Sequence, residues 1–440
     1  KYGLTEANIE GYYFWNFARF KIGWQCEKEI NSLQEGHSIA KERYKDKILI
    51  WVNKVKNFPR YFIGTSEQND ILIICHPRRV LIDGYYECIY TEQVSREFSN
   101  ITVIEGDYQG KHYKPIQTKH IIYTDPVDAL SFLKCVYVTK ILPKRFQMIK
   151  NKIMQYIEMP VKELNDFFSI HLKIDQWAME MTYGFFSYEV ERWYYKRILD
   201  QKKPKIVVEV VSYSRGCMIV NELAKERGIV TVEMQHGTIG KQHGAYNYPA
   251  GSKIRQFPDY VFVFSDYWKN KARFPISSDK IVATGYPFLE RMNEKYASIR
   301  EKERSAKNIL FLSSGPIGDR LGKIAYELSK KLSTSEYHII YKLHPGEYAV
   351  WREKYTYFIG CNIEVIDSNR HNLYELFAKS DIQISGYNTT AIFEGLFYNL
   401  PTYVLNYDLS DELQELCDAG YISRFSGTQD LLELIQNSKK

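Results

Sequence analysis

The chain has 440 residues, of which 45% are hydrophobic and 25% are charged, and its formal net charge is +6. This length allows two α/β domains with separate cores, and the composition is that of an ordinary globular protein. No Lys/Arg tract resembles a nucleic-acid-binding arm and no zinc-finger or RNA-recognition signature occurs, so we expect no nucleic-acid partner. The mild positive charge fits anionic ligands or an anionic membrane face.

The cysteines indicate a reducing compartment. The seven residues are scattered, at positions 26, 75, 88, 135, 217, 361 and 417, without a CxxC pair, which argues against a disulfide framework. No signal peptide is visible, and no run of about 18 apolar residues could span a bilayer. We expect a cytoplasmic protein, with the cytoplasmic face of the membrane as an alternative location.

The first part of the chain predicts one early helix, three strands and a helical region. Gly11 to Trp24 is aromatic and basic, which predicts a helix that either packs on the first domain or lies at a membrane edge. We predict strands at Asp70 to His76, Ile101 to Glu105 and Ile121 to Tyr123. From 127 to 200 the pattern becomes helical and rich in Phe, Tyr and Trp.

The most regular pattern lies between Lys205 and Gly285. Here we predict strands at Lys205 to Ser212, Ile229 to Met234, Asp259 to Ser265 and Lys280 to Gly285. Arg215 to Arg227, closed by Gly228, predicts a helix. Strands that alternate with helices favour a parallel sheet, which binds ligands at the carboxyl ends of its strands.

A charged segment, residues 291–307, has no strong apolar face, and we place the domain linker there. A second α/β unit starts at Asn308 to Ser314. The predicted fold class is therefore α/β with two Rossmann-like domains that face a cleft: residues 1–300, with a helical insertion at 127–200, and residues 301–440.

The loop after the strand Ile229 to Met234 is the first candidate site. It begins Gln235-His-Gly-Thr, and its glycines let a ligand approach the backbone closely. His236 could act as a general base toward a hydroxyl, because imidazole titrates near neutral pH. A histidine that only holds the loop is the alternative. Zinc binding by His236 and His243 lacks further ligands at a recognisable spacing. The remaining candidates for acceptor binding or loop support are Gln235, Gly237, His243 and Arg215.

Two turns in the second domain are candidate phosphate sites. The strand Ile339 to Leu343 ends at His344 and Pro345, where the imidazole could donate to a phosphate of a leaving nucleotide. A strand-terminal turn with a structural histidine is the alternative. Ser314 and Gly315 lie in a turn of small residues whose spacing is not the dinucleotide-binding fingerprint.

The stretch from Ser380 to Asn406 predicts a strand at Ile382 to Ile384, a polar turn, a helix and a second strand. Such a turn offers free backbone N–H groups and hydroxyls to phosphates. A capped helix of any α/β protein is the alternative. We predict four binding side chains here: Ser385, Thr389 and Thr390 for phosphates and Glu394 for a ribose.

Several catalytic motifs are absent from the sequence, among them GxSxG, HExxH, the P-loop and the kinase signatures. A DxD-type pair that would hold a metal with a nucleotide diphosphate is also absent. We therefore expect no metal and no cofactor apart from the donor substrate.

Three segments together resemble bacterial cell-surface polymer transferases of the GT-B fold, in particular the CDP-glycerol glycerophosphotransferases and the bacterial sialyltransferases and polysialyltransferases. These segments are residues 233–241, 341–347 and 380–406. The resemblance implies that His236 is the catalytic base, and that His344-Pro345 and Thr389-Thr390 bind nucleotide phosphates. Gly386, where the glycerophosphotransferases tend to have an acid, and an inserted Asn388 leave the donor nucleotide open.

The resemblance implies an inverting glycosyltransferase of capsule or O-antigen synthesis. It would move a sugar or sugar-like unit from a nucleotide-sugar donor to a hydroxyl of a glycan or lipid-linked acceptor, with peripheral association with the inner membrane. Two alternatives stay open: a nucleotide-sugar 2-epimerase of the same fold and a non-catalytic glycan-binding assembly component.

Overall fold

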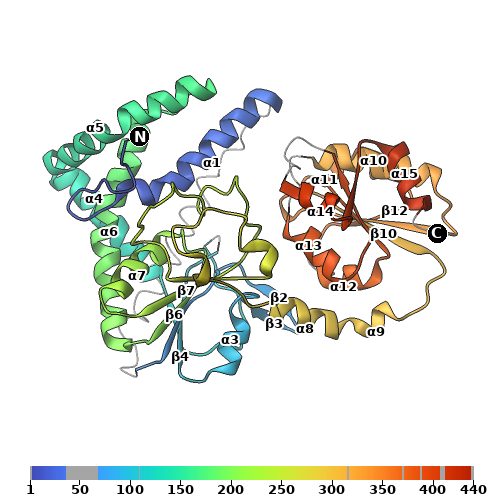
Figure 1. Cartoon of the computed structure of the whole chain (residues 1–440), viewed down its shortest axis with the longest axis horizontal. Helices are drawn as coiled ribbons and strands as arrows, with labels where there is room; N and C mark the ends of the chain where they lie inside the picture. Colours follow the sequence, from blue (N-terminus) through green and yellow to red (C-terminus); the bar gives the residue numbers. More distant parts are fainter. Residues whose placement is uncertain are drawn as a thin grey trace. The chain divides into compact units, whose positions relative to one another are not determined.

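The computed structural model describes residues 2–35, 68–108, 110–314, 317–368, 371–386, 389–406 and 412–437. It divides into two compact units, Lys1–Gly285 and Tyr286–Lys440, and each unit has its own parallel sheet (Figure 1).

The first unit is built on a seven-stranded parallel sheet in the order β5-β4-β1-β6-β7-β8-β9. The chain first adds β4 and β5 on one side of β1 and then adds β6 to β9 on the other side, so the strand order reverses between β1 and β6. This reversal is the topological switch point, where sheets of this kind bind ligands. The strands are β1 (Ile71–Ile74), β4 (Ile101–Glu105), β5 (Ile121–Tyr123), β6 (Ile206–Val210), β7 (Val230–Met234), β8 (Tyr260–Val263) and β9 (Ile281–Ala283).

The predicted helical insertion is confirmed: α4 (Asp125–Ile141), α5 (Pro143–Phe168) and α6 (Ile174–Lys202) span it. Together with α1 (Phe14–Glu35) and α7 (Arg215–Lys225), these helices pack in one core with the sheet. Helix α5 shows why the sequence folds this way, because Ile149, Ile153, Ile157 and Val161 recur every fourth residue and are all buried. Figure 1 shows α1, α4, α5 and α6 at the same end of the unit. The unit also contains the hairpin of β2 (Val80–Ile82) and β3 (Tyr85–Glu87) and the short helix α3 (Glu92–Glu97), which were not predicted from the sequence.

The second unit has a six-stranded parallel sheet in the order β12-β11-β10-β13-β14-β15. Its strand order reverses between β10 and β13, which gives a second switch point. The strands are β10 (Lys307–Leu312), β11 (Tyr337–Lys342), β12 (Ile363–Ile366), β13 (Ile382–Ser385), β14 (Thr402–Leu405) and β15 (Ile422–Phe425). The helices of four residues or more that follow are α10 (Gly318–Lys331), α11 (Trp351–Lys354), α12 (Leu373–Lys379), α13 (Thr390–Phe397), α14 (Gln414–Asp418) and α15 (Thr428–Asn437). The predicted fold class, α/β with two Rossmann-like domains, is confirmed.

The segment predicted as a linker is largely helical. It contains the end of α8 (Pro287–Lys295) and all of α9 (Ala297–Arg300). Phe288 and Met292 are buried, and the Phe288 ring meets the Tyr374 ring edge-on at 5.2 Å. The sequence of residues 291–307 did not predict this apolar face, because Phe288 lies before that charged segment.

Candidate functional site

His236 lies in the loop directly after β7, one strand from the switch point of the first unit. Its side chain is 13% exposed, and its Nε2 atom lies 3.1 Å from the hydroxyl of Tyr213, which follows β6. Burial, together with the nearby His76, His243 and Arg78, lowers the pKa of His236 to about 3. The imidazole is therefore neutral at physiological pH, which is the form that accepts a proton.

Glu233 stands behind His236. Its carboxyl group is fully buried, and Oε1 accepts hydrogen bonds from the Ser212 backbone N–H at 3.0 Å and the Tyr246 hydroxyl at 2.6 Å. The same oxygen lies 3.8 Å from Nδ1 of His236. Neither this Nδ1 nor Oε2 of Glu233 has a hydrogen-bond partner among the residues that the structure describes. Burial raises the pKa of Glu233. The two groups are close enough to interact electrostatically without sharing a hydrogen bond.

The turn after β6 is strained. Val211 has a φ of +64°, which is rare for a β-branched residue and costs about 1–3 kcal/mol. The next residue, Ser212, donates its backbone N–H to Glu233, and Ser214 caps α7 by accepting from the Cys217 backbone N–H at 3.4 Å. Strain of this kind concentrates at functional sites, and here it lies at the switch point beside Tyr213.

His76 follows β1 and lies beside His236. Its ring centroid lies 6.3 Å from that of His236 and 6.0 Å from that of Tyr90, and burial and Arg78 lower its pKa to about 4. The ends of β1, β6 and β7 therefore present His76, Tyr213 and His236 together.

Sequence reasoning missed His76, Tyr213 and Glu233. One signal for Glu233 was visible: Glu209 and Glu233 are each the fourth residue of a short apolar strand, and they are paired in register between β6 and β7. Glu209 is also fully buried. Its Oε1 accepts from the Asn221 side chain at 2.8 Å, and burial raises its pKa to about 8. Carboxyl groups in buried strands are rare unless they have a role or a partner.

The other residues predicted in this loop have supporting contacts. Gln235 donates to the Gly237 carbonyl at 2.8 Å and accepts from the Phe264 backbone N–H at 2.8 Å, so it ties the loop to β8. A Cβ atom at Gly237 would meet no atom within 4 Å. His243 stacks on Phe20 of α1 at 5.6 Å.

Arg215 is the first residue of α7 and is engaged inside the unit. Its Nε donates to Glu191 at 2.6 Å, and one Nη donates to the Gly184 carbonyl. These contacts join α7 to α6.

The turn at the switch point of the second unit carries small polar residues. Ser385 ends β13 and is fully buried. Its hydroxyl has no hydrogen-bond partner among the described residues, and neither does the buried hydroxyl oxygen of Ser314, which follows β10. Gly386 is closely packed: a Cβ there would lie 2.0 Å from Cδ1 of Ile317 and 3.2 Å from Cβ of Leu405, so the Ile317 side chain would have to shift. Gly315 and Asn388 lie outside the described residues.

Helix α13 begins in this turn. Thr389 is its N-cap, and the Thr389 hydroxyl accepts from the Ala391 backbone N–H at 3.3 Å. Thr390 is the first helical residue and is partly buried. Glu394, one turn later, is 8% exposed and accepts from the Tyr374 hydroxyl at 3.3 Å. Burial raises the pKa of Glu394 to about 7, so both of its protonation states are accessible near neutral pH.

His344 has a structural function. Its ring nitrogen Nδ1 accepts from the Gly346 backbone N–H at 3.2 Å, and its own backbone N–H donates to Glu347 at 3.0 Å. This reciprocal pair is a capping box at the N-terminus of the short 3₁₀ helix Pro345–Glu347. The side chain is exposed to solvent at the carboxyl end of β11.

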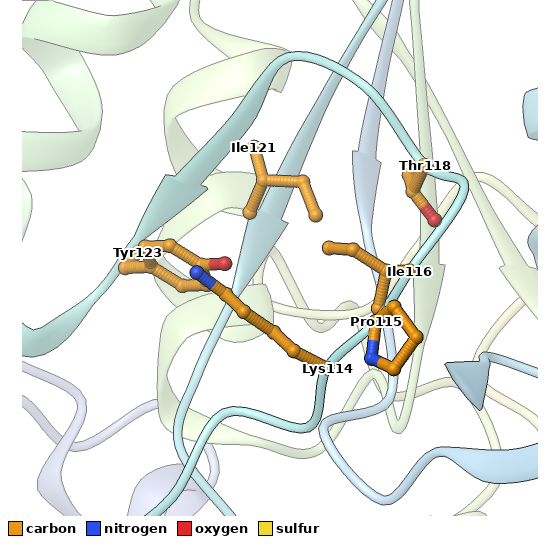
Figure 2. A pocket seen from close by; sticks show the side chains of 6 residues that line it. All are labelled: Lys114, Pro115, Ile116, Thr118, Ile121 and Tyr123. Atoms are coloured by element: carbon orange, nitrogen blue, oxygen red, sulfur yellow. The ribbon is translucent and has the colours of Figure 1, made fainter. Parts of the chain in front are cut away.

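An open pocket of about 700 Å³ lies elsewhere in the first unit, beside the edge strand β5 (Figure 2). Figure 2 shows the Lys114 side chain extending toward the Tyr123 ring, and Nζ lies 6.0 Å from the ring centroid. None of the side chains predicted to carry chemistry lines it. Nowhere in the described part of the chain do three or more His, Cys, Asp or Glu side chains gather as a metal site.

No protein-family model matches the chain, and no curated protein matches it. Solved structures are similar at low identity. The UDP-GlcNAc 2-epimerase from Methanocaldococcus jannaschii has a TM-score of 0.48 and 12% identity over 84% of this chain and 92% of its own. The wall teichoic acid polymerase TagF has a TM-score of 0.42 and 13% identity, covering 86% and 82%. The Acinetobacter baumannii MurG structure has a TM-score of 0.40 and 14% identity, covering 58% and 70%. Similarity at this level concerns architecture and says nothing of the reaction.

Proposed function

We propose that the chain is a glycosyltransferase. It transfers a sugar or sugar-like unit from a nucleotide-activated donor to a hydroxyl of a glycan or lipid-linked acceptor, with inversion and without a metal ion. The observation that carries this proposal is the arrangement at the carboxyl end of β7, where Nε2 of His236 lies 3.1 Å from the Tyr213 hydroxyl and Nδ1 lies 3.8 Å from the Glu233 carboxyl group.

In the proposed reaction, an acceptor hydroxyl takes the place of the Tyr213 hydroxyl at Nε2 of His236. Its proton passes to Nε2 as the acceptor oxygen forms a bond to the anomeric carbon. The bond from that carbon to the donor phosphate breaks, and its electron pair leaves with the nucleotide. Glu233 offsets the positive charge that develops on the imidazole, which favours the transition state over the ground state.

The second unit is proposed to bind the departing nucleotide. The hydroxyls of Ser314 and Ser385, which have no hydrogen-bond partner among the described residues, suit phosphate oxygens. The N-terminus of α13 at Thr389 and Thr390 adds backbone N–H groups and a favourable dipole. His344 would donate to a phosphate, and Glu394 would bind the ribose. Both hydroxyls lie next to the switch point between β10 and β13, where sheets of this kind bind ligands.

A two-step experiment tests the proposal. A thermal-shift screen against CMP, CDP, UDP, GDP and their sugars should identify one stabilising nucleotide. Nucleotide release is then measured for wild type and His236→Ala, with and without hydroxyl acceptors. We expect acceptor-dependent release in wild type and none above background in His236→Ala, with nucleotide binding retained.

Other results would identify another function. Conversion of a UDP-sugar without an acceptor would mean a 2-epimerase. Glycan binding without nucleotide release from any donor would mean a non-catalytic assembly component. A product with the donor's anomeric configuration would contradict inversion. We further propose that the acceptor belongs to a capsule or O-antigen polysaccharide assembled at the cytoplasmic face of the inner membrane.

A further inference from the structure

Helix α4 has apolar residues on two opposite faces. Val127 and Val138 are buried in the unit, and the Cys135 thiol donates to the Tyr183 carbonyl of α6 at 3.6 Å. The opposite side is apolar as well, and its six residues are each between 40% and 62% exposed. We call these residues the α4 outer face: Phe132, Leu133, Val136, Tyr137, Ile141 and Leu142.

The α4 outer face runs along the solvent side of α4. Its helical members recur at helix spacing, with Val136 one turn after Phe132 and Tyr137 one turn after Leu133. A helix that buries one apolar stripe normally exposes polar residues on the other side. Six large apolar side chains gathered on an exposed face mark a site of interaction.

The segment of the chain that carries the α4 outer face is basic. Residues 129–157 contain six basic residues (Lys134, Lys140, Lys144, Arg145, Lys150 and Lys152) and no acidic residue. Lys134 and Arg145 pair with Glu189 of α6, and Lys150 pairs with Asp175. The other three, Lys140, Lys144 and Lys152, are exposed and form no ion pair with the residues that the structure describes. Lys140 directly precedes Ile141, so exposed cations border the apolar side chains.

We propose that the α4 outer face binds the surface of an anionic lipid bilayer. Apolar side chains would enter the boundary between headgroups and acyl chains, the lysines would contact anionic headgroups, and Tyr137 suits the interfacial depth. The helix would lie along the membrane, since no helix in the described ranges is long and apolar enough to cross one. A second copy of this chain is a poorer occupant, because a symmetric contact would bring the same lysines together.

The inference places the membrane contact on α4 and not on the segment from Gly11 to Trp24. In α1 the residues Phe14, Ala18 and Ile22 are buried in the core of the unit, so this apolar stripe is covered, and Trp24, 57% exposed, is a single exposed side chain next to it. The inference stands on the α4 surface alone and does not depend on the transferase proposal.

Co-sedimentation with vesicles tests the inference. The full chain is mixed with vesicles of phosphatidylcholine alone or of phosphatidylcholine and phosphatidylglycerol. We expect binding to the anionic vesicles only, weakened by salt. Leu133→Ser/Val136→Ser/Ile141→Ser should abolish it, and Lys140→Gln and Lys144→Gln should each lower the partition coefficient about fivefold.

The matched control variant is Ile359→Ser/Tyr421→Ser, which changes two similarly exposed residues of the second unit, 63% and 65% exposed, and should bind as wild type does. Circular dichroism and the melting temperature show whether each variant is folded. The inference is overturned if wild type ignores anionic vesicles, if the triple variant binds as wild type does, or if neutral vesicles bind equally well. It is also overturned if wild type is a dimer in light scattering and the triple variant is a monomer, which would make this face a contact between copies.

Discussion

Nδ1 of His236 lies 3.8 Å from Oε1 of Glu233, three residues earlier in the chain. Glu233 is held from two sides, by the Ser212 backbone N–H and by the Tyr246 hydroxyl. The carboxyl group is therefore fixed in place before His236 gains a proton, and a preorganised group of this kind needs no reorganisation during the reaction. We assign Glu233 as a positioning residue for His236.

Replacing Glu233 tests this assignment. Glu233→Gln keeps the shape of the side chain and removes the carboxyl group that can balance the charge of the developing imidazolium. We expect kcat to fall by about 10²-fold with little change in KM. Tyr246→Phe, which removes one hydrogen bond to Glu233 and keeps its carboxyl group, is the control and should have a smaller effect. Equal losses in the two variants, or a change in KM alone, would indicate a structural role.

The low pKa of His236 predicts unusual activity in acid. An ordinary histidine base loses activity below about pH 6.5, because it becomes protonated. His236 has a pKa of about 3, so the neutral base persists, and kcat at saturating donor should stay level as the pH falls from about 7 to about 5. A pH profile of kcat at saturating donor, corrected for unfolding by circular dichroism, measures this, because protonation of Glu394, with a pKa of about 7, affects donor binding and therefore KM. A decline with an apparent pKa of about 6.5 would contradict the environment found for His236.

His344 can be tested for ligand binding separately from its structural role. Asparagine can still cap the turn Pro345–Glu347, because its side-chain oxygen accepts a backbone N–H as Nδ1 of His344 does, whereas alanine cannot. If the imidazole also donates to a phosphate, both His344→Asn and His344→Ala should weaken nucleotide binding about tenfold in calorimetry. His344→Ala alone should also lower the melting temperature. Full nucleotide affinity in His344→Asn would mean that His344 caps the turn and does not bind the phosphate.

The buried hydroxyl of Ser385 gives a further test. A buried hydroxyl without a partner costs about 1–3 kcal/mol, so Ser385→Ala should leave the free energy of unfolding unchanged or raise it. Nucleotide affinity should fall about tenfold if the hydroxyl binds a phosphate. Ser380→Ala is the matched control, because the Ser380 hydroxyl donates to the Leu376 carbonyl at 2.7 Å. Ser380→Ala should lose stability and keep nucleotide affinity. If Ser385→Ala instead loses stability and keeps nucleotide affinity, Ser385 is not part of the site.

Glu209 predicts a pH-dependent stability. Its pKa is about 8 in the folded chain and about 4.5 when unfolded. The folded state therefore holds the extra proton between these values, and the free energy of unfolding falls as the pH rises through this window, by up to about 1.4 kcal/mol per pH unit. Glu209→Gln does not titrate. Urea unfolding should show similar stability for the two proteins at about pH 4 and a more stable variant at about pH 9. A less stable variant at about pH 9 would mean that the charged carboxylate is stabilising.

Local patterns were sufficient to predict most of the strands and the helical insertion. A strand such as β6 is a continuous apolar run, and α5 repeats its isoleucines every fourth residue, so the signal lies within a few neighbouring residues. The missed elements include several short strands. β2 and β12, for example, carry too few residues for a periodic signal, and their strand conformation depends on pairing with β3 and β11.

The sequence by itself also determined the candidate turns, since Gln235-His236-Gly237 and the Ser385 to Thr390 segment follow apolar strands directly. Only the tertiary structure decided which residues meet there. His76, Tyr213 and His236 are far apart in the chain, and they come together because β1, β6 and β7 are neighbours in the sheet. Strand order is a non-local property, which local periodicity does not encode. For the same reason, only the fold showed that Arg215 is engaged with Glu191 and that one face of α4 remains uncovered.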